Sequence, residues 1–149
     1  MKLGFFTAAL PGNTLEQAAK WGAESGFQAI EVACWPLEKA TRRYAGVTHI
    51  DVTGLDKPGA NEIRKMLNGY GLPISALGYY PNPLHPEAEH RETVIAHLKK
   101  VIEAAALLEV PVVGTSSARI RTKPSRRTWK ITLKSGRRSS SLPGSAGSR

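Results

Sequence analysis

Apolar residues follow two different spacings along the first 115 positions of the chain. Short apolar runs predict buried strands, whereas apolar residues three or four positions apart, such as Val94, Leu98 and Val101, predict one face of a helix. The predicted strands cover residues 2–7, 27–33, 73–79 and 110–115, and the predicted helices cover residues 14–25, 60–69 and 87–108. Strands therefore alternate with helices throughout this region.

This alternation predicts right-handed βαβ units and a parallel sheet, in either a doubly wound open sheet or part of a (β/α)8 barrel. Residues 7–12, which follow the first strand, lack the glycine-rich phosphate loop of a dinucleotide-binding sheet. Four strands would also make half of a barrel of typical size, roughly 250 residues. We therefore predict an α/β fold, a partial (β/α)8 TIM barrel of about four βα units.

Local signals mark where the helices begin and end. Asn13 followed by Glu16 predicts a capping box at the start of the first helix. Gly26 and Gly71 stand where the first two helices should stop, because glycine adopts the left-handed conformation that ends many helices. Residues 34–59 form a long irregular connection, and connections of that length inside a compact domain are usually functional.

The formal net charge of +9 comes entirely from the last part of the chain. Residues 1–115 hold 11 Lys and Arg residues against 12 Asp and Glu residues, whereas residues 116–149 hold 10 Lys and Arg residues and no acidic residue. The first part has the composition of a globular domain. The second is a basic, low-complexity tail whose few apolar residues cannot offset the entropy of ordering it, so we expect it to be disordered.

Cysteine content and hydropathy restrict the cellular location. A single cysteine, Cys34, excludes a secreted scaffold held by intrachain disulfides. The apolar residues 3–10 are too few for a signal peptide and are better explained as the first strand. No apolar run is long enough to span a membrane. We therefore expect a cytoplasmic protein without a membrane partner.

Four separated segments resemble one enzyme family. They are Ile-Glu-Val-Ala-Cys-Trp-Pro at 30–36, Ala-Gly-Val-Thr-His-Ile-Asp-Val at 45–52, His-Arg-Glu-Thr-Val-Ile-Ala-His-Leu-Lys-Lys at 90–100 and Val-Pro-Val-Val-Gly-Thr at 110–115. Together they resemble the sugar phosphate isomerase/epimerase group of the xylose isomerase-like TIM-barrel superfamily, which also includes endonucleases acting on abasic DNA. The resemblance implies a sugar or sugar phosphate substrate and proton transfer next to a carbonyl, assisted by Mn, Mg or Zn.

The resemblance covers residues 1–115 and stops at Thr115. In the family, the metal ligands and catalytic carboxylates lie on strands five to eight, so none is carried over to a residue of this chain. We expect a chain truncated before the metal-binding half, with no metal and no activity alone. A shift of one nucleotide in the reading frame near codon 115 would explain the tail, because it permits an acidic, family-like sequence in place of residues 116–149.

Barrel active sites lie at the carboxyl ends of the strands, which selects five candidate substrate-binding residues. Glu31 could instead pair with a cationic side chain, and His49, the strongest single candidate, could be a solvated loop histidine. Trp35 and Tyr79 fit the wall of a sugar pocket as well as simple packing. His85 completes the set from the proline-rich loop after the third strand.

Other residues favour simpler interpretations or competing functions. Cys34 is expected to be a buried apolar residue, because no activating partner is evident, and His90 and His97 are expected to be solvated. The tail predicts sequence-independent, salt-sensitive nucleic-acid binding as an alternative function. An abasic-site endonuclease relative on the same fold is a further alternative that the resemblance implies. A half barrel would also leave its first and last strands unpaired, which predicts self-association through the sheet edges.

Overall fold

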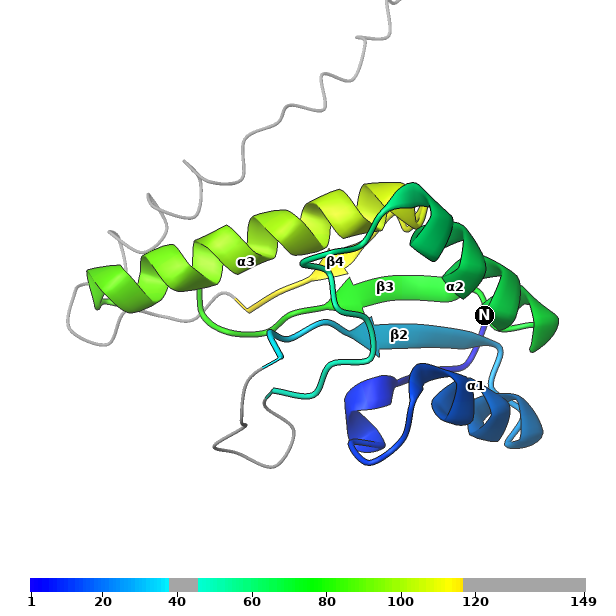
Figure 1. Cartoon of the computed structure of the whole chain (residues 1–149). Coiled ribbons are helices and arrows are strands. Elements are labelled where there is room, and N and C mark those ends of the chain that lie inside the picture. The colour runs from blue at the N-terminus through cyan, green and yellow to red at the C-terminus, as the bar shows by residue number, and fades with distance from the viewer. Residues whose placement is uncertain (38–45, 117–149) are drawn as a thin grey trace, which may run out of the picture.

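The computed structural model describes residues 1–37 and 46–116 and forms a four-stranded parallel sheet with three α-helices (Figure 1). The elements in chain order are β1 (Gly4–Phe6), a 3-10 turn η1 (Thr7–Ala9), α1 (Leu15–Glu24), β2 (Ala29–Ala33), α2 (Lys57–Gly69), β3 (Ile74–Gly78), α3 (Ala88–Leu107) and β4 (Val113–Gly114). The predicted alternation of strands and helices is therefore confirmed.

The strand order decides between the two architectures that the sequence allowed. The sheet runs β1-β2-β3-β4, so each strand pairs with the next one in the chain and all pairs are parallel. Because right-handed crossovers in one direction place every helix on the same face, the sheet is singly wound. A doubly wound sheet reverses its strand order. The structure is thus consistent with part of a barrel, and its second sheet face carries no helix from the described residues.

The core lies between the helices and the face of the sheet that they cover. Ile30 and Val32 of β2 and Leu77 of β3 are fully buried there against side chains of the helices, including Leu67 and Val101. Since side chains alternate along a strand, Glu31, Gly78 and their neighbours face the opposite, uncovered side. That alternation positions the candidate site.

The first two helices begin at residues whose side chains cap their free backbone N–H groups. Thr14 caps α1 in a reciprocal capping box with Gln17, so the cap lies one residue after the predicted Asn13. The Asp56 carboxylate accepts a hydrogen bond from the Gly59 amide at 2.9 Å, and Pro58 follows in the first turn of α2. This cap explains why α2 begins at Lys57, three residues before the predicted start.

All three helices end in the same hydrogen-bonding pattern. After each last turn, one amide bonds back across five residues and the preceding amide across three, as in Phe27 to Gly22 at 3.0 Å. This is the Schellman motif, and its left-handed residue is Gly26 in α1, Gly71 in α2 and Glu109 in α3. The two glycine stops were predicted, whereas the stop at Glu109 was not.

The remaining differences from the sequence predictions concern the last strand of the sheet and the basic tail. β4 is limited to Val113–Gly114, although the apolar run predicted a strand over 110–115. Apart from Ser116, the basic tail lies outside the described residues, so its predicted disorder and origin are not tested. No helix within the described ranges is long and apolar enough to cross a membrane.

Candidate functional site

The carboxyl ends of the parallel strands meet at one end of the sheet, on the left in Figure 1. Part of the long connection, residues 46–52, folds back to this end. Cys34 and Thr48 form an antiparallel bridge, and the His49 amide donates a hydrogen bond to the Ala33 carbonyl at 2.9 Å. The connection therefore continues the end of β2 and forms part of the rim.

A carboxylate and a cluster of three aromatic rings lie on the uncovered face of the sheet. The Tyr80 hydroxyl donates a hydrogen bond to Oε1 of Glu31. The Phe6 ring meets the Tyr80 ring edge to face at 5.6 Å between centroids, and the Trp35 ring lies 6.1 Å from Phe6 and 6.0 Å from Tyr80. We call Phe6, Glu31, Trp35 and Tyr80 the strand-end site.

Two glycines leave the space that this arrangement occupies. A Cβ atom at Gly78 would lie 2.7 Å from Oε1 of Glu31 and 2.7 Å from the Phe6 ring. A Cβ atom at Gly114 would lie 2.5 Å from the Tyr80 hydroxyl. Neither glycine has a positive φ, so the backbone conformation does not require glycine at these positions. The requirement is steric, and it comes from the side chains of the strand-end site.

The charges of the site favour hydrogen bonding to hydroxyl groups. Burial, together with the neighbouring Glu31 carboxyl, raises the pKa of Tyr80 to about 12, so the phenol keeps its proton and donates at neutral pH. A carboxylate has further acceptor positions after one is filled. Aromatic faces beside such an acceptor can pack against apolar C–H groups of a ligand. The site is therefore suited to a small polyhydroxylated molecule.

His49 is joined through its backbone to the end of β2, but its side chain lies in a different environment from the strand-end site. Both of its ring nitrogens are buried and have no hydrogen-bond partner among the described residues. Burial lowers its pKa from 6.5, an effect partly offset by backbone groups of Asn13 and Leu10. The ring therefore packs against the loop that follows β1, so the alternative of a solvated loop histidine is wrong, whereas a substrate-binding role of His49 stays a prediction.

Tyr79, Cys34 and His97 pack together on the helix side of the rim. Tyr79 is 3% exposed, and its ring lies 4.6 Å from the His97 ring and 5.8 Å from Trp35. His97 is buried, and its Nε2 lies 2.8 Å from the Cys34 carbonyl, so this nitrogen carries the proton and donates. The expectation that His97 is solvated is therefore wrong. Cys34 is buried, and burial raises its pKa to about 12.

His85 lies in the loop after β3, away from the carboxylate contacts. Its ring stands 4.4 Å from the ring of the exposed His90, and its Nδ1 accepts a hydrogen bond from the Glu87 amide at 3.3 Å. Arg91 donates to the His85 carbonyl at 2.9 Å. These contacts order the start of α3, and among the described residues no hydrogen bond or ring contact joins His85 to the strand-end site.

Sequence reasoning found two of the four residues in the strand-end site. Glu31 and Trp35 were predicted, and the structure brings them together; Tyr79 touches Trp35 from the helix side. Phe6 and Tyr80 were missed. The alternation of β1 could have placed Phe6 on the face of Glu31. Nothing in the local pattern distinguishes Tyr80 from its neighbour, because its position depends on how the loop after β3 turns.

The described residues do not group into a metal centre. Within residues 1–37 and 46–116, no three His, Cys, Asp or Glu side chains are grouped closely enough to hold a cation. Glu31 is the single carboxylate of the strand-end site, and a divalent cation usually takes several oxygen or nitrogen ligands. The described residues therefore do not fit the divalent metal that the resemblance implies.

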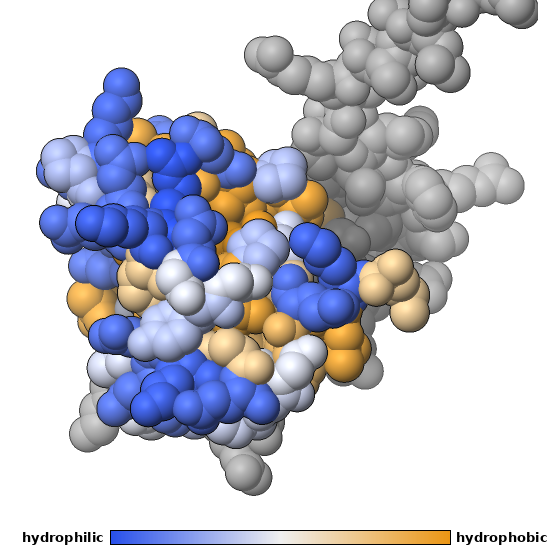
Figure 2. Space-filling view, turned by 90° about the vertical axis from the view of Figure 1, so that its right-hand side faces the viewer, coloured by the Kyte–Doolittle hydropathy of each residue, from blue (hydrophilic) through white to orange (hydrophobic). Residues whose placement is uncertain are grey.

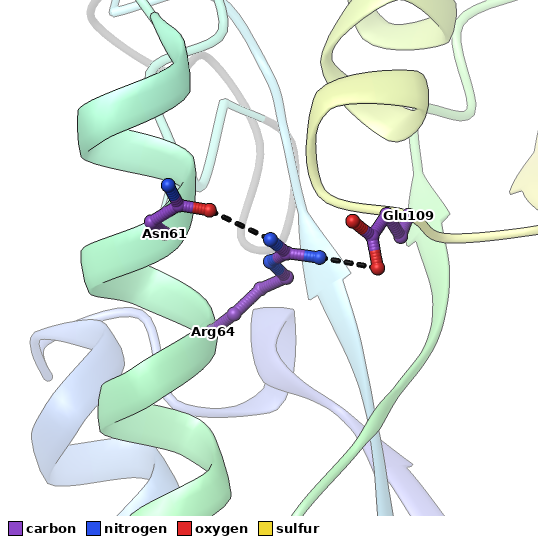
Figure 3. Close-up of polar contacts among 3 residues, drawn as sticks. All are labelled: Asn61, Arg64 and Glu109. Atoms are coloured by element: carbon purple, nitrogen blue, oxygen red, sulfur yellow. Dashed lines mark hydrogen bonds and ion pairs between the residues drawn. The ribbon is translucent and has the colours of Figure 1, made fainter.

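A second concave region lies at the opposite end of the sheet, where the strands begin (Figure 2). It is a cleft of about 260 Å³ between α2, α3 and the start of β3, with an apolar floor that includes Leu67 and Leu108. Arg64 crosses its rim, donating to Asn61 at 2.6 Å and pairing with Glu109 (Figure 3). In barrels this end of the strands contributes stability and the other end carries activity.

Comparisons with known proteins agree on the fold. A family model described as xylose isomerase-like TIM barrel matches residues 19–138, a range that continues beyond Thr115. The solved structure of D-psicose 3-epimerase with D-tagatose from Clostridium cellulolyticum H10 is similar, with a TM-score of 0.60 and 16% identity. That match covers 91% of this chain and 46% of the epimerase, so the chain spans about half of its length. No curated protein matches the sequence significantly.

Proposed function

Because the chain belongs to the xylose isomerase-like TIM-barrel family, we propose that its strand-end site binds a sugar or sugar phosphate for isomerisation or epimerisation. The observation that carries this proposal is the Glu31 carboxyl, which accepts a hydrogen bond from Tyr80, whose ring packs with Phe6 and Trp35. It lies at the carboxyl ends of the strands, where barrel enzymes place their active sites.

The geometry supports binding through two complementary contacts. The rings of Phe6, Trp35 and Tyr80 offer apolar faces to the C–H groups of a sugar. Glu31 offers acceptor positions to sugar hydroxyls, and carboxylates in such positions can also move a proton next to a carbonyl. D-tagatose, which the similar epimerase structure contains, is a suitable first probe.

We propose a narrower role for this chain alone: it binds and orients the sugar without converting it. The chain spans 46% of the similar epimerase, and the described residues supply one carboxylate to the site. The resemblance implies Mn, Mg or Zn, which would polarise the carbonyl of the sugar if it were bound. Since no described group of ligands fits that cation, we assign Glu31 and the three rings to sugar binding only.

Calorimetric titration of the full chain with D-tagatose tests this proposal. Binding should be measurable, and Glu31→Gln should weaken it about tenfold, because a charged hydrogen-bond acceptor is replaced by a neutral amide. Glu16→Gln is the matched control, since Glu16 accepts a hydrogen bond from Tyr70 at 3.2 Å on the helix surface. Equal affinities in all three proteins would contradict the sugar site.

Chromatographic analysis of the same mixtures tests the narrower role. With Mn²⁺, Mg²⁺ or Zn²⁺ added, we expect bound D-tagatose to be recovered unchanged. Formation of a second ketose by the purified chain, lost in Glu31→Gln, would show that the chain is an active enzyme and would refute the role of binding alone.

A further inference from the structure

Tyr80 has contacts that a simple loop residue would not need. It follows β3 by two residues, yet its hydroxyl reaches Glu31 on the neighbouring strand, and its ring packs edge to face on Phe6 of β1. It is 38% exposed, so this position is not explained by the need to bury the ring. Its hydroxyl also occupies the space beside Gly114 on the other neighbouring strand.

Gly78 and Gly114 show that the sheet accommodates this arrangement. Glycine weakens a strand, because it has no side chain to pack and loses more entropy on folding. Both positions nevertheless hold glycine without a positive φ. An alanine at Gly114 would place its Cβ 2.5 Å from the Tyr80 hydroxyl, and one at Gly78 would crowd Oε1 of Glu31 at 2.7 Å.

We propose that Tyr80 is a positioning residue that fixes the orientation of the Glu31 carboxyl in the strand-end site, and that Gly78 and Gly114 provide the space for this pair. With Oε1 held by the phenol, the carboxyl cannot rotate freely, and its remaining acceptor positions keep one direction. The use of that orientation for sugar hydroxyls rests on the proposed function. The orientation itself does not.

Two substitutions separate the Tyr80 hydroxyl from the Glu31 carboxyl in different ways. Tyr80→Phe keeps the ring and removes the donor, and Gly114→Ala keeps the phenol but displaces it from Glu31. The displaced atoms belong to the end of a side chain, so we expect Gly114→Ala to fold. Gly69→Ala is the matched control, because a Cβ there meets no heavy atom within 4 Å and the φ of Gly69 is not positive.

Carbon-13 NMR of the full chain, labelled at the side-chain carboxyl of glutamate and the phenolic carbon of tyrosine, reports whether the Tyr80 hydroxyl holds the Glu31 carboxyl in solution. Tyr80→Phe and Gly114→Ala should both shift the Glu31 carboxyl signal, and Glu31→Gln should shift the Tyr80 signal, while Gly69→Ala shifts neither. The dissociation constant for D-tagatose should rise about tenfold in Tyr80→Phe, as expected for the loss of a hydrogen bond to a charged group.

The outcomes separate positioning from packing and from the proposed function. An unchanged Glu31 signal in folded Tyr80→Phe and Gly114→Ala would overturn the inference. A lower melting temperature with an unchanged Glu31 signal would show packing only and would also overturn it. If the wild-type chain binds no D-tagatose, the proposed sugar site fails, and the two NMR signals still decide whether Tyr80 positions Glu31.

Discussion

His49 combines a half-buried side chain with two ring nitrogens that are shielded from solvent and unpaired among the described residues. Burial lowers its pKa from 6.5, so the folded state binds a proton less readily than the unfolded state does. Below pH 6.5 the unfolded chain gains protons that the folded chain resists, and the free energy of unfolding falls. Well above pH 6.5 both states are neutral at this site, and it contributes no dependence on pH.

Urea unfolding of the wild type and His49→Gln at several pH values measures this effect. The wild type should lose stability as the pH is lowered below 6.5, and His49→Gln should lose less over the same range. His90→Gln, at an exposed histidine of α3, should follow the wild type. Identical pH profiles for all three proteins would show that His49 does not titrate differently in the folded state.

At the residue scale, the sequence identified those site residues whose charge or size differs from that of their neighbours. Glu31 stands out as a charge within an apolar strand, and Trp35 as a large ring just after it. The structure places both in the strand-end site. His97 was assigned to solvent, although its helix turns it inward to the Cys34 carbonyl. A polar residue on an apolar helix face is buried when a backbone acceptor lies opposite it, and only the tertiary structure brings that acceptor there.

The three helix ends differ in the residue at the left-handed position. Gly26 and Gly71 adopt positive φ without a steric penalty, whereas Glu109 has a φ of 57° and carries a Cβ. The carboxylate of Glu109 forms an ion pair with Arg64 across the mouth of the cleft (Figure 3). The Glu109 side chain is 73% exposed, and exposed ion pairs contribute about 0–1 kcal/mol. The ion pair between Arg64 and Glu109 therefore exceeds the conformational cost of the left-handed Glu109 backbone by little at most.

Substitutions at Glu109 should reverse the usual ranking of alanine and glycine. Glu109→Gly should be more stable than Glu109→Ala by about 1 kcal/mol, because both lose the ion pair and only glycine relieves the left-handed strain. At Glu103, an exposed residue inside α3, glycine should instead be less stable than alanine by about 1 kcal/mol. Thermal or urea unfolding measures both differences. The same order at both positions would contradict the assignment of strain.

At the element scale, periodicity located every helix and strand of the described structure, but not their ends. Glycine marked the ends of α1 and α2, whereas Glu109 gave no signal because its conformation is imposed by the chain passing from α3 to β4. The start of α2 was placed late because Asp56 and Pro58 precede the apolar positions of the helix. β4 was placed too long because an apolar run does not show how much of it finds a partner.

The sheet has two outer strands, and within the described residues neither β1 nor β4 pairs on its outer side. Exposed apolar side chains lie close to both: Leu3 precedes β1 and is 64% exposed, and Val112 precedes β4 and is 50% exposed. Open strands with apolar neighbours recruit further strands. The alternation of strands and helices did not by itself give the strand order, because the same alternation also suits a doubly wound sheet; the missing phosphate loop and the strand count favoured the partial barrel, and the observed order agrees with it.

We expect the full chain to self-associate through these outer strands in a concentration-dependent way. Leu3→Lys and Val112→Lys should each shift the distribution toward monomer, since a charge beside an outer strand opposes pairing. Leu37→Lys, at an exposed apolar residue that does not flank β1 or β4 in the chain, is the control. Sedimentation velocity over a range of concentrations measures the distribution. A wild-type monomer at all concentrations, or equal effects of all three variants, would exclude association through the strand edges.

The sequential order β1-β2-β3-β4 also affects how the protein folds. Each strand hydrogen-bonds only to strands next to it in the chain, so no two paired strands are separated by more than one helix and its connections. Pairing between successive strands costs less loop entropy than pairing between strands further apart in the chain. During synthesis, each βα unit can pack against the preceding unit as soon as it emerges from the ribosome, because the strand before it in the chain is one of its sheet partners. This topology suits vectorial folding, from the amino terminus onward, as the chain is made.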